Sequence, residues 1–293
     1  NPLPWRPLPT VLALAADGQG SGHYRVIHPA VALSAAGLAD VRLSQRHWLP
    51  AEMERLQPDA WILQSQVREP QIEMLRRQAQ FTRAFKVAEL DDYLPGLPAA
   101  HPHRPDLPQD VLGALRRSVA LADRLMVSTA ALAEALGGLH PDIRVLPTRL
   151  PPIWWRGLSS QRRAGQRPRV GWVGRAAHQG DLAQIADVVQ ALAGEVEWVF
   201  LGTCPAALRP YVHEQHEAVP IDQYPRKLAS LNLDLALAPL APGLFNECKS
   251  NQRLLEYGAC GVPVVCSDLA PYRGTLPITR VHNRFEDWVH AIP

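Results

Sequence analysis

The sequence contains little cysteine and little lysine, and it has no long apolar run. Among its 293 residues are four cysteines, which show no Cys-x-x-Cys spacing and are far sparser than in a disulfide-stapled secreted domain. No apolar stretch approaches the roughly 20 residues of a membrane-spanning helix, and residues 1–10 lack the basic-then-apolar order of a signal peptide. We therefore expect a protein of the reducing cytoplasm, without a membrane span.

An excess of one charge is also absent. The 30 Lys and Arg residues nearly balance the 28 Asp and Glu residues, for a formal net charge of +2. Bulk binding to a nucleic-acid backbone requires a basic stripe, so nucleic acid is not expected as a partner. A composition of 47% hydrophobic and 20% charged residues is that of a globular protein, and the length allows two domains.

Short runs of Val, Ile and Leu alternate with longer amphipathic segments along the chain, which is the pattern of βα units around parallel sheets. The pattern lapses around residues 156–168, which we interpret as a linker. We predict an α/β protein of two Rossmann-like, doubly wound domains facing across a cleft, over residues 1–155 and 169–293. Ligands of such sheets bind at the carboxyl ends of the strands. The predicted elements used below are helices over residues 23–36, 181–193 and 247–259, and a strand over 217–219.

The segment over residues 240–268 carries the chemistry. It reads as a strand end, a loop of small residues, a helix beginning between Glu247 and Lys249, and a further strand. A helix start presents unpaired amides and the positive end of the dipole, and Lys249 adds a full charge there, so we predict an anion site. Lys249 and Glu256 are seven residues apart on one helix face, about 10 Å along the axis. That span suits a diphosphate and a ribose diol.

These residues resemble the donor-binding signature of the GT-B glycosyltransferases, in the large retaining family called group 1 or family 4. Particularly similar is a bacterial subgroup with Asn-x-x-Lys-Ser followed by Glu-Tyr-x-Ala-x-Gly-x-Pro-Val-Val. The matching residues are Asn246, Lys249, Ser250, Glu256, Tyr257, Ala259, Gly261, Pro263, Val264 and Val265. The likeness extends to Gly171, Gly174, His178, Asp181 and Leu182, to residues 224–240, and in the first half to residues 20–25, 91–93 and 128–129.

The resemblance implies an enzyme that moves a sugar from a nucleoside diphosphate, of the UDP or GDP type, to an acceptor, with retention of configuration and without metal. The acceptor is unknown: a protein, a cell-surface or other glycan, or a lipid-linked molecule. No cofactor is expected besides the donor. The implied donor-binding residues are Gly174 and Arg175 near the phosphates, Tyr224 near the base, Lys249, Ser250 and Asn251 at the diphosphate, and Glu256 at the ribose.

One position departs from the wider family, which carries two glutamates eight positions apart. Counting back eight from Glu256 gives Cys248, with Glu247 one position away. Whether Glu247 does the work of the first glutamate is therefore open. We take His23, Lys249 and Glu247 as the catalytic candidates.

A glycine-rich loop, Gly18-Gln-Gly-Ser-Gly22, follows the first predicted strand. It lacks the GxxG step of a dinucleotide fingerprint, and the second strand ends at Ser44 without an acidic residue for a ribose. We interpret it as a loop that contacts acceptor or donor phosphate. The candidates for an acceptor or cleft role are Gly20, Ser21, Gly22, Tyr24, Arg25, Asp91 and Asp92.

Several of these residues have alternative interpretations. His23 contacts the sugar or leaving group, or is structural. Arg25 faces phosphate, or sits on the helix surface. Asp91 and Asp92 line the cleft as an acceptor contact or base, hold a metal, or form a turn pair before Pro95; we favour the cleft over the metal.

Two rival functions stay open at this point. One is a non-catalytic GT-B module that binds a nucleotide or a partner, and the other is a nucleotide-sugar epimerase. The chain begins at Asn1 without Met and stops at Pro293 directly after an apparent helix. We therefore expect a module of a larger polypeptide, fused to other domains.

Overall fold

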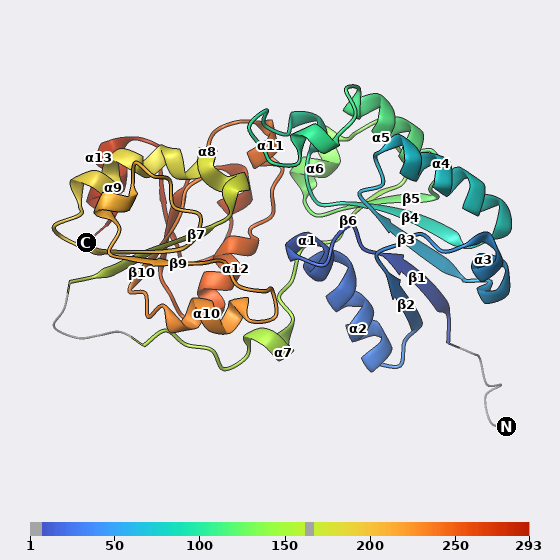
Figure 1. Ribbon diagram of the computed structural model, residues 1–293, viewed down its shortest axis with the longest axis horizontal. Helices are drawn as coiled ribbons and strands as arrows, with labels where there is room; N and C mark the ends of the chain where they lie inside the picture. The colour runs from blue at the N-terminus through green and yellow to red at the C-terminus, as the bar shows by residue number, and fades with distance from the viewer. Residues whose placement is uncertain (1–7, 162–166, 293) are drawn as a thin grey trace. The chain divides into compact units, whose positions relative to one another are not determined.

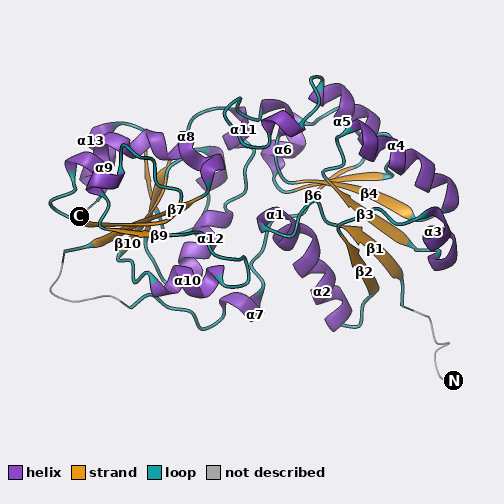
Figure 2. Ribbon diagram, in the orientation of Figure 1, coloured by secondary structure: helices purple, strands orange, loops and turns teal. Residues whose placement is uncertain are grey.

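The computed structural model describes residues 8–161 and 167–292 and contains two compact units, each built on a six-stranded sheet with helices on its faces (Figures 1 and 2). Unit 1 is formed by Asn1–Leu97 and His103–Thr148, and unit 2 by Pro98–Pro102 and Arg149–Pro293. The predicted linker over 156–168 includes residues 162–166, which lie outside the described residues, as do 1–7 and 293. The domain limits 1–155 and 169–293 stay predictions.

Unit 1 has the strand order β2-β1-β3-β4-β5-β6, and every neighbouring pair is parallel. This order reverses between β1 and β3, as in flavodoxin-like sheets. The strands are β1 Thr10–Leu14, β2 Asp40–Ser44, β3 Ala60–Gln64, β4 Phe85–Leu90, β5 Arg124–Val127 and β6 Ile143–Val145. The α-helices are α1 Gly20–Gly22, α2 His28–Ala35, α3 Pro50–Leu56, α4 Glu69–Gln78, α5 Val111–Val119 and α6 Ala130–Ala135. Shorter elements are the π-helical η1 His23–Ile27 and the 3-10 helices η2 Ala79–Phe81, η3 Leu94–Gly96 and η4 Arg104–Asp106.

Unit 2 has the order β12-β11-β10-β7-β8-β9, again parallel throughout, which is the strand order of a Rossmann sheet and reverses between β7 and β10. The strands are β7 Arg169–Gly174, β8 Glu197–Gly202, β9 Glu214–His216, β10 Leu235–Ala238, β11 Val264–Ser267 and β12 Thr279–Val281. The α-helices are α7 Pro152–Trp155, α8 Gln179–Leu182, α9 Ala186–Ala191, α10 Tyr224–Ser230, α11 Leu244–Glu247, α12 Gln252–Ala259 and α13 Phe285–Ala291. The 3-10 helices are η5 Ala176–His178, η6 Ala183–Ile185, η7 Arg209–Tyr211 and η8 Ala270–Tyr272.

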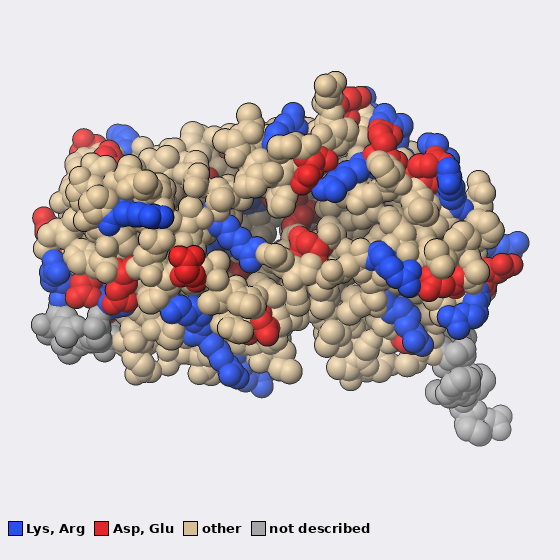
Figure 3. Space-filling view, viewed as in Figure 1, with Lys and Arg blue, Asp and Glu red and all other residues tan. Residues whose placement is uncertain are grey.

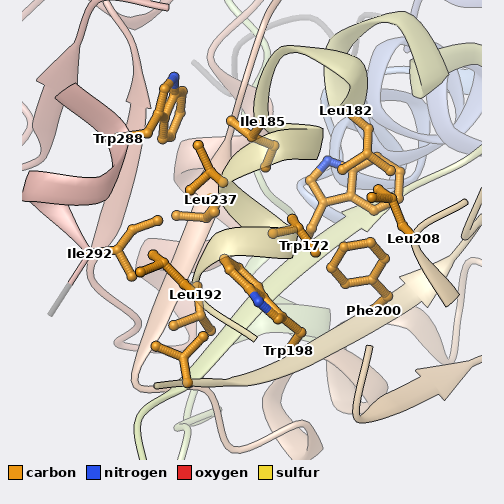
Figure 4. Close-up of a cluster of buried hydrophobic side chains, with 14 of the residues drawn as sticks. Trp172, Leu182, Ile185, Leu192, Trp198, Phe200, Leu208, Leu237, Trp288 and Ile292 are labelled. Atoms are coloured by element: carbon orange, nitrogen blue, oxygen red, sulfur yellow. The ribbon is translucent and has the colours of Figure 1, made fainter. Parts of the chain in front are cut away.

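The core of unit 2 packs large aromatic side chains among Leu, Ile and Val residues (Figure 4). Trp172 on β7 and Phe200 on β8 lie with ring centroids 5.5 Å apart, and Trp198 and Trp288 are fully buried. Trp288 brings α13 onto this core. Burying such large side chains stabilises the unit by several kcal/mol in total, at about 25 cal/mol per Å² of apolar surface. The core holds β7 firmly, and the candidate site follows this strand.

The helix predicted over residues 23–36 begins with a π-helical turn. The N–H of His28 donates to the carbonyl of His23, five residues back. Pro29 follows, and it has no N–H for the carbonyl of Arg25, so a wider turn at this point avoids an unmade α-helical bond. In consequence three consecutive residues, Tyr24, Arg25 and Val26, are buried.

Three other predicted elements were wrong in their limits. The helix over 181–193 is divided among α8, η6 and α9. The strand predicted over 217–219 lies three residues earlier, as β9. β9 is an edge strand, and its Glu214 forms an ion pair with Arg169, so its residues do not show the apolar pattern on which the prediction relied. The helix over 247–259 is interrupted by residues 248–251, which separate α11 from α12.

Candidate functional site

The candidate site lies in unit 2, where the strand order reverses. β7 and β10 are neighbours in the sheet, and their following loops leave the sheet in opposite directions. The segment after β7 leads through η5 into α8, and the segment after β10 leads into α11 and α12. Most of the predicted donor-binding residues stand on these two segments, so the topology brings them to one edge of the sheet.

Asp181 joins the two segments through a single buried carboxylate. One oxygen, Oδ1, accepts hydrogen bonds from the Ala241 N–H at 3.0 Å and from Asn246 Nδ2 at 2.8 Å. The other oxygen, Oδ2, lies 3.2 Å from His178 Nδ1 and 3.4 Å from Lys249 Nζ. Asp181 is 5% exposed, so its charge is held by these partners in place of water. The sequence placed Asp181 only within the family likeness and gave it no role.

The protonation states at this carboxylate follow from its surroundings. Burial alone would raise the pKa of Asp181, but the hydrogen bond with His178 and the charge of Lys249 outweigh burial and hold the pKa below its ordinary value. Burial lowers the pKa of His178. The arrangement at neutral pH is therefore an ionised Asp181 between a neutral imidazole and an ammonium group.

Lys249 is held from two sides, but it is not part of α12. Its ammonium lies 3.4 Å from Asp181 and 4.8 Å from the centroid of the Phe245 ring, within range of a cation–π contact. Because α12 begins at Gln252, the prediction that Lys249 and Glu256 share one helix face was wrong. Asn246 on α11 donates to both Asp181 and the Ala241 carbonyl, which ties α11 to the segment after β10 and to α8.

Ser250 and Asn251 lead into the start of α12, where Asn251 is the N-cap residue and its side chain makes no capping hydrogen bond. The backbone N–H groups of these two residues have no hydrogen-bond partner within residues 8–161 and 167–292. The anion site predicted there accordingly keeps its donors available. It is offset by about one turn from the helix start that the sequence indicated.

Glu256 lies on α12, and both of its carboxylate oxygens have partners. Oε2 accepts a hydrogen bond from Tyr224 Oη at 2.9 Å, and Oε1 accepts one from Gln252 Nε2 at 2.8 Å. Arg253 Nη1 lies 3.8 Å from Oε2 and donates to Tyr224 Oη at 3.3 Å. The carboxylate is thus oriented by neighbours at i−4 and i−3 and by one residue from α10. The i−3 and i−4 spacings were visible in the sequence, and they could have identified Gln252 and Arg253.

Tyr224 begins α10 and links Glu256 to the segment before β7. Besides its hydrogen bond to Glu256, its ring packs edge-on against Trp155 of α7, with centroids 5.9 Å apart. The sequence predicted Tyr224 near the base of the nucleotide. The structure places it in contact with the residue predicted to bind the ribose.

Tyr257, the other half of the Glu-Tyr pair in the motif, anchors α12 to the sheet. Its hydroxyl accepts a hydrogen bond from the Val173 N–H at 3.2 Å and donates one to the Leu237 carbonyl at 3.4 Å. Burial raises the pKa of Tyr257 to about 12, so the hydroxyl keeps its proton at neutral pH. Because Val173 is on β7 and Leu237 on β10, this one side chain fixes α12 over the point where the strand order reverses.

Gly174 and Arg175 end β7. A Cβ atom at Gly174 would collide with the ring of Trp172, so core packing by itself accounts for this glycine. Arg175 is exposed, and its carbonyl accepts the His178 N–H at 2.8 Å. That bond closes the turn from which His178 reaches Asp181.

Glu247 ends α11 and bonds to the neighbouring loop. Its Oε2 accepts a hydrogen bond from the Ala270 N–H at 2.8 Å, at the start of η8. Cys248, at the position where the wider family has its first glutamate, is fully buried. The first family position therefore carries a buried thiol, and one oxygen of the neighbouring Glu247 is bonded to the loop that leads into η8.

The glycine-rich loop of unit 1 is organised by Asp17. Its carboxylate accepts hydrogen bonds from Ser21 Oγ at 3.1 Å and from the Gly22 N–H at 3.2 Å. A Cβ atom at Gly22 would collide with the Asp17 carbonyl, whereas Gly20 has open space around it. Only glycine therefore fits at position 22, whereas a larger residue would fit at position 20.

Arg25 takes neither of the two positions considered from the sequence. It is 4% exposed and forms an ion pair with Glu89 on β4, with 2.6 Å between Nε and Oε1. Its Nη1 also donates to the Leu146 carbonyl at 2.5 Å and to Thr148 Oγ1 at 3.3 Å. The π-helical turn directs Arg25 inward, so an exposed position and a free phosphate contact are both wrong.

The remaining unit 1 candidates lie on η1 and directly after β4. Tyr24 is buried, and the His23 ring lies 5.2 Å from the His28 ring, between centroids. Burial raises the pKa of Asp91 well above its usual range, and the adjacent charge of Asp92 adds to the effect. The Asp91 carbonyl accepts a hydrogen bond from Ser128 Oγ at 2.9 Å.

Across residues 8–161 and 167–292, no group of three or more His, Cys, Asp and Glu side chains is arranged to hold a metal ion. None of the described helices is long and apolar enough to cross a membrane. On the face drawn in Figure 3, acidic and basic side chains lie intermingled over each unit.

Comparison with solved structures identifies the fold. The chain is similar to a glycosyltransferase from Rickettsia africae (TM-score 0.67, 11% identity, covering 97% of this chain and 87% of that one). It is also similar to sucrose-phosphate synthase from Thermosynechococcus elongatus (TM-score 0.62, 12% identity, 98% and 89% covered). HepE from Anabaena, in complex with UDP and glucose, has a TM-score of 0.56 at 13% identity, with 97% and 89% covered.

These similarities confirm the predicted fold class, an α/β GT-B fold with two Rossmann-like parts. At such low identity they establish the fold and not the activity. The sequence matches no protein-family model and no curated protein.

Proposed function

We propose that the protein is a glycosyltransferase that takes a sugar from a nucleoside diphosphate bound by unit 2 and transfers it to an acceptor bound by unit 1. One observation carries the proposal. In a GT-B fold, the reversal point of the second sheet holds Lys249 beside the unpaired amides of Ser250 and Asn251, with Glu256 on the helix that follows. A cation, free amide donors and a carboxylate are the groups that bind a diphosphate and a ribose diol.

The chemistry follows from the charge that develops on the leaving group. The bond between the anomeric carbon and the diphosphate oxygen breaks, and a bond from the anomeric carbon to the acceptor oxygen forms on the same face of the sugar. The acceptor proton passes to the departing phosphate oxygen. Lys249 and the amides at the start of α12 stabilise the diphosphate as its charge grows, so the step requires no metal ion.

The other predicted donor-binding residues are assigned to the ribose and to the phosphates. Glu256 receives the ribose hydroxyls, Gly174 and Arg175 lie at the phosphate approach after β7, and Tyr224 lies beside the ribose. HepE, one of the similar structures, is in complex with UDP and glucose, which supports a donor of the UDP type; a GDP donor is the alternative. A cytoplasmic location and fusion to further domains stay predictions.

The test is release of nucleotide from a panel of UDP-, GDP- and CMP-sugars. We expect one donor class to release nucleotide, and Lys249→Met to slow that release by about 10²–10³-fold, the usual cost of removing one group that stabilises developing negative charge. Lys227→Met is the matched control, since this lysine of the same unit contacts His216 and not the site. Release that is equal in the two variants, or absent with every donor, would refute the proposal.

The geometry also favours one rival, a module that binds a nucleotide without turnover. Cys248 replaces the first family glutamate, and Glu247 is bonded to the Ala270 N–H. Binding of a nucleoside diphosphate that is lost in Lys249→Met, together with no release from any donor, would establish this rival. Conversion of the donor sugar in the absence of an acceptor would instead identify an epimerase.

A further inference from the structure

The two oxygens of Asp181 have separate tasks. Oδ1 is used by Ala241 and Asn246 and holds the segment after β10 to α8. Oδ2 contacts the His178 imidazole and the Lys249 ammonium, two side chains that can carry a positive charge. The carboxylate is buried, so its position is set by the protein and not by solvent.

Lys249 requires such a partner because the helix does not fix it. A lysine side chain has four rotatable bonds and little preferred geometry of its own. Lys249 stands in the turn between α11 and α12, and within residues 8–161 and 167–292 its ammonium contacts the Phe245 ring and Asp181.

We propose that Asp181 is a positioning residue: it fixes the Lys249 ammonium where the donor diphosphate binds, and acts on the reaction through Lys249. This inference rests on the proposed function and adds a residue to it. His178 occupies the other side of Oδ2 in its neutral form, so the carboxylate has a single cation to hold. Asp181 and Lys249 are 68 residues apart in the sequence, so the fold is what brings them into contact.

Simple electrostatics makes the opposite prediction, which allows a sharp test. Asp181 is an anion next to a proposed diphosphate site, so Asp181→Asn raises the local charge by one unit. If Lys249 contributed only net charge, the variant would bind nucleoside diphosphate more tightly and would keep its rate. If Asp181 positions Lys249, the rate of transfer falls although the site has become more positive.

Asp181→Asn distinguishes the roles of the two carboxylate oxygens. The amide oxygen still accepts the bonds from Ala241 and Asn246, while the amide nitrogen cannot accept from Lys249. We expect the rate of nucleotide release to fall about 10- to 100-fold, since a displacement near 1 Å at a reacting group costs up to about 10²-fold. Asp187→Asn on α9 is the control, because Asp187 is exposed and contacts the neighbouring Val188 N–H. An unchanged or higher rate for Asp181→Asn would overturn the proposal.

A double-mutant cycle tests whether Asp181 acts through Lys249. In a Lys249→Met background, Asp181→Asn should change the rate by less than about twofold, because the group it positions is gone. Multiplicative effects would overturn the proposal and leave Asp181 an independent or purely stabilising residue. If Asp181→Asn does not fold, Asn246→Ser replaces it in the cycle, since it removes one of the two hydrogen bonds that orient Oδ1 and keeps the charge; a smaller loss and the same non-additivity with Lys249→Met are expected, and multiplicative effects would again overturn the proposal.

A measurement without nucleotide distinguishes failure of this inference from failure of the proposed function. The chain has only three lysines, Lys86, Lys227 and Lys249, so reductive ¹³C-methylation gives three lysine NMR signals, which can be assigned by substitution and told apart from the signal of the α-amine. In Asp181→Asn the Lys249 signal should shift while the other two remain in place. A wild type that releases no nucleotide refutes the function alone, whereas an unmoved Lys249 signal refutes the positioning role.

Discussion

Replacing Glu256 by Gln should weaken nucleotide binding with little change in shape. The carboxylate is 3% exposed and accepts one hydrogen bond from Tyr224 and one from Gln252. A carboxylate has about four lone-pair sites, so roughly two remain for a ribose diol. The amide loses one acceptor oxygen and the charge. Hydrogen bonds to charged groups contribute about 1.5–3 kcal/mol, so the affinity for UDP or GDP should fall about 10- to 100-fold.

The assay compares ribose with deoxyribose. Calorimetric titration of the wild type should show weaker binding of the 2′-deoxy and 3′-deoxy nucleoside diphosphates than of the parent nucleotide. In Glu256→Gln this discrimination should largely disappear. Tyr224→Phe is the matched control, since it removes a partner of the carboxylate and leaves the charge in place; its affinity should fall less.

Stability must be measured alongside, because Glu256 also faces Arg253 at 3.8 Å. Breaking a largely buried ion pair can cost about 3–5 kcal/mol, and partial unfolding would mimic a loss of affinity. Denaturant unfolding of both variants corrects for this. If Glu256→Gln is folded, binds within twofold of the wild type and still prefers ribose, the assignment of Glu256 to the ribose is refuted.

Three further predictions concern stability. Arg169→Met removes the partner of Glu214 and Glu197, and denaturant unfolding should show a loss of about 1.5 kcal/mol, the lower end of the range for a hydrogen bond to a charged group, since the carboxylates keep solvent contact. The hydrogen bond from Arg169 lowers the pKa of Glu214 from 4.5 to about 2, so this stabilisation is complete above pH 4.5 and is lost as pH falls towards 2; the variant should lack most of that loss. Tyr257→Phe leaves the buried Val173 N–H without its acceptor and should lower the free energy of unfolding by about 1–3 kcal/mol, without affecting a surface control. Burial lowers the pKa of His28 from 6.5 to about 4, so the unfolded chain takes up the proton first and stability declines as pH falls from 6.5 to 4; His28→Gln should flatten this decline in thermal unfolding, and an unchanged slope would contradict the assignment.

The helical and strand segments that could be predicted are those with strong local signals. The runs around Thr10–Leu14 and Arg169–Gly174 are apolar and bounded by turn residues, and both are strands. Pro225 in the first turn of α10 marked that helix correctly. Limits failed where distant residues take part: Asn246 on the short α11 is bonded to Asp181, 65 residues away, and the polar β9 is a strand because it pairs with β8.

The candidate site divides in the same way. Lys249, Ser250, Asn251 and Glu256 stand in one short segment, and a local motif was sufficient to select them. The role of Asp181 could not be predicted, because three of its partners, Ala241, Asn246 and Lys249, lie 60, 65 and 68 residues away in the sequence and only the fold brings them to it.

By itself, the sequence determined the class of the fold and the segment that carries the donor chemistry, because hydrophobic period, glycine and proline placement, and motif spacing are all local properties. The tertiary structure decided which charges meet. Arg25 is neutralised by Glu89 across 64 residues, and Lys249 is held by Asp181 across 68. Buried charges require partners wherever the chain can supply them, and parallel sheets with long crossovers supply them from segments far apart in the sequence. The sequence shows that lysine is scarce, but only the contacts of Lys249 show which partners hold the one lysine of the candidate site.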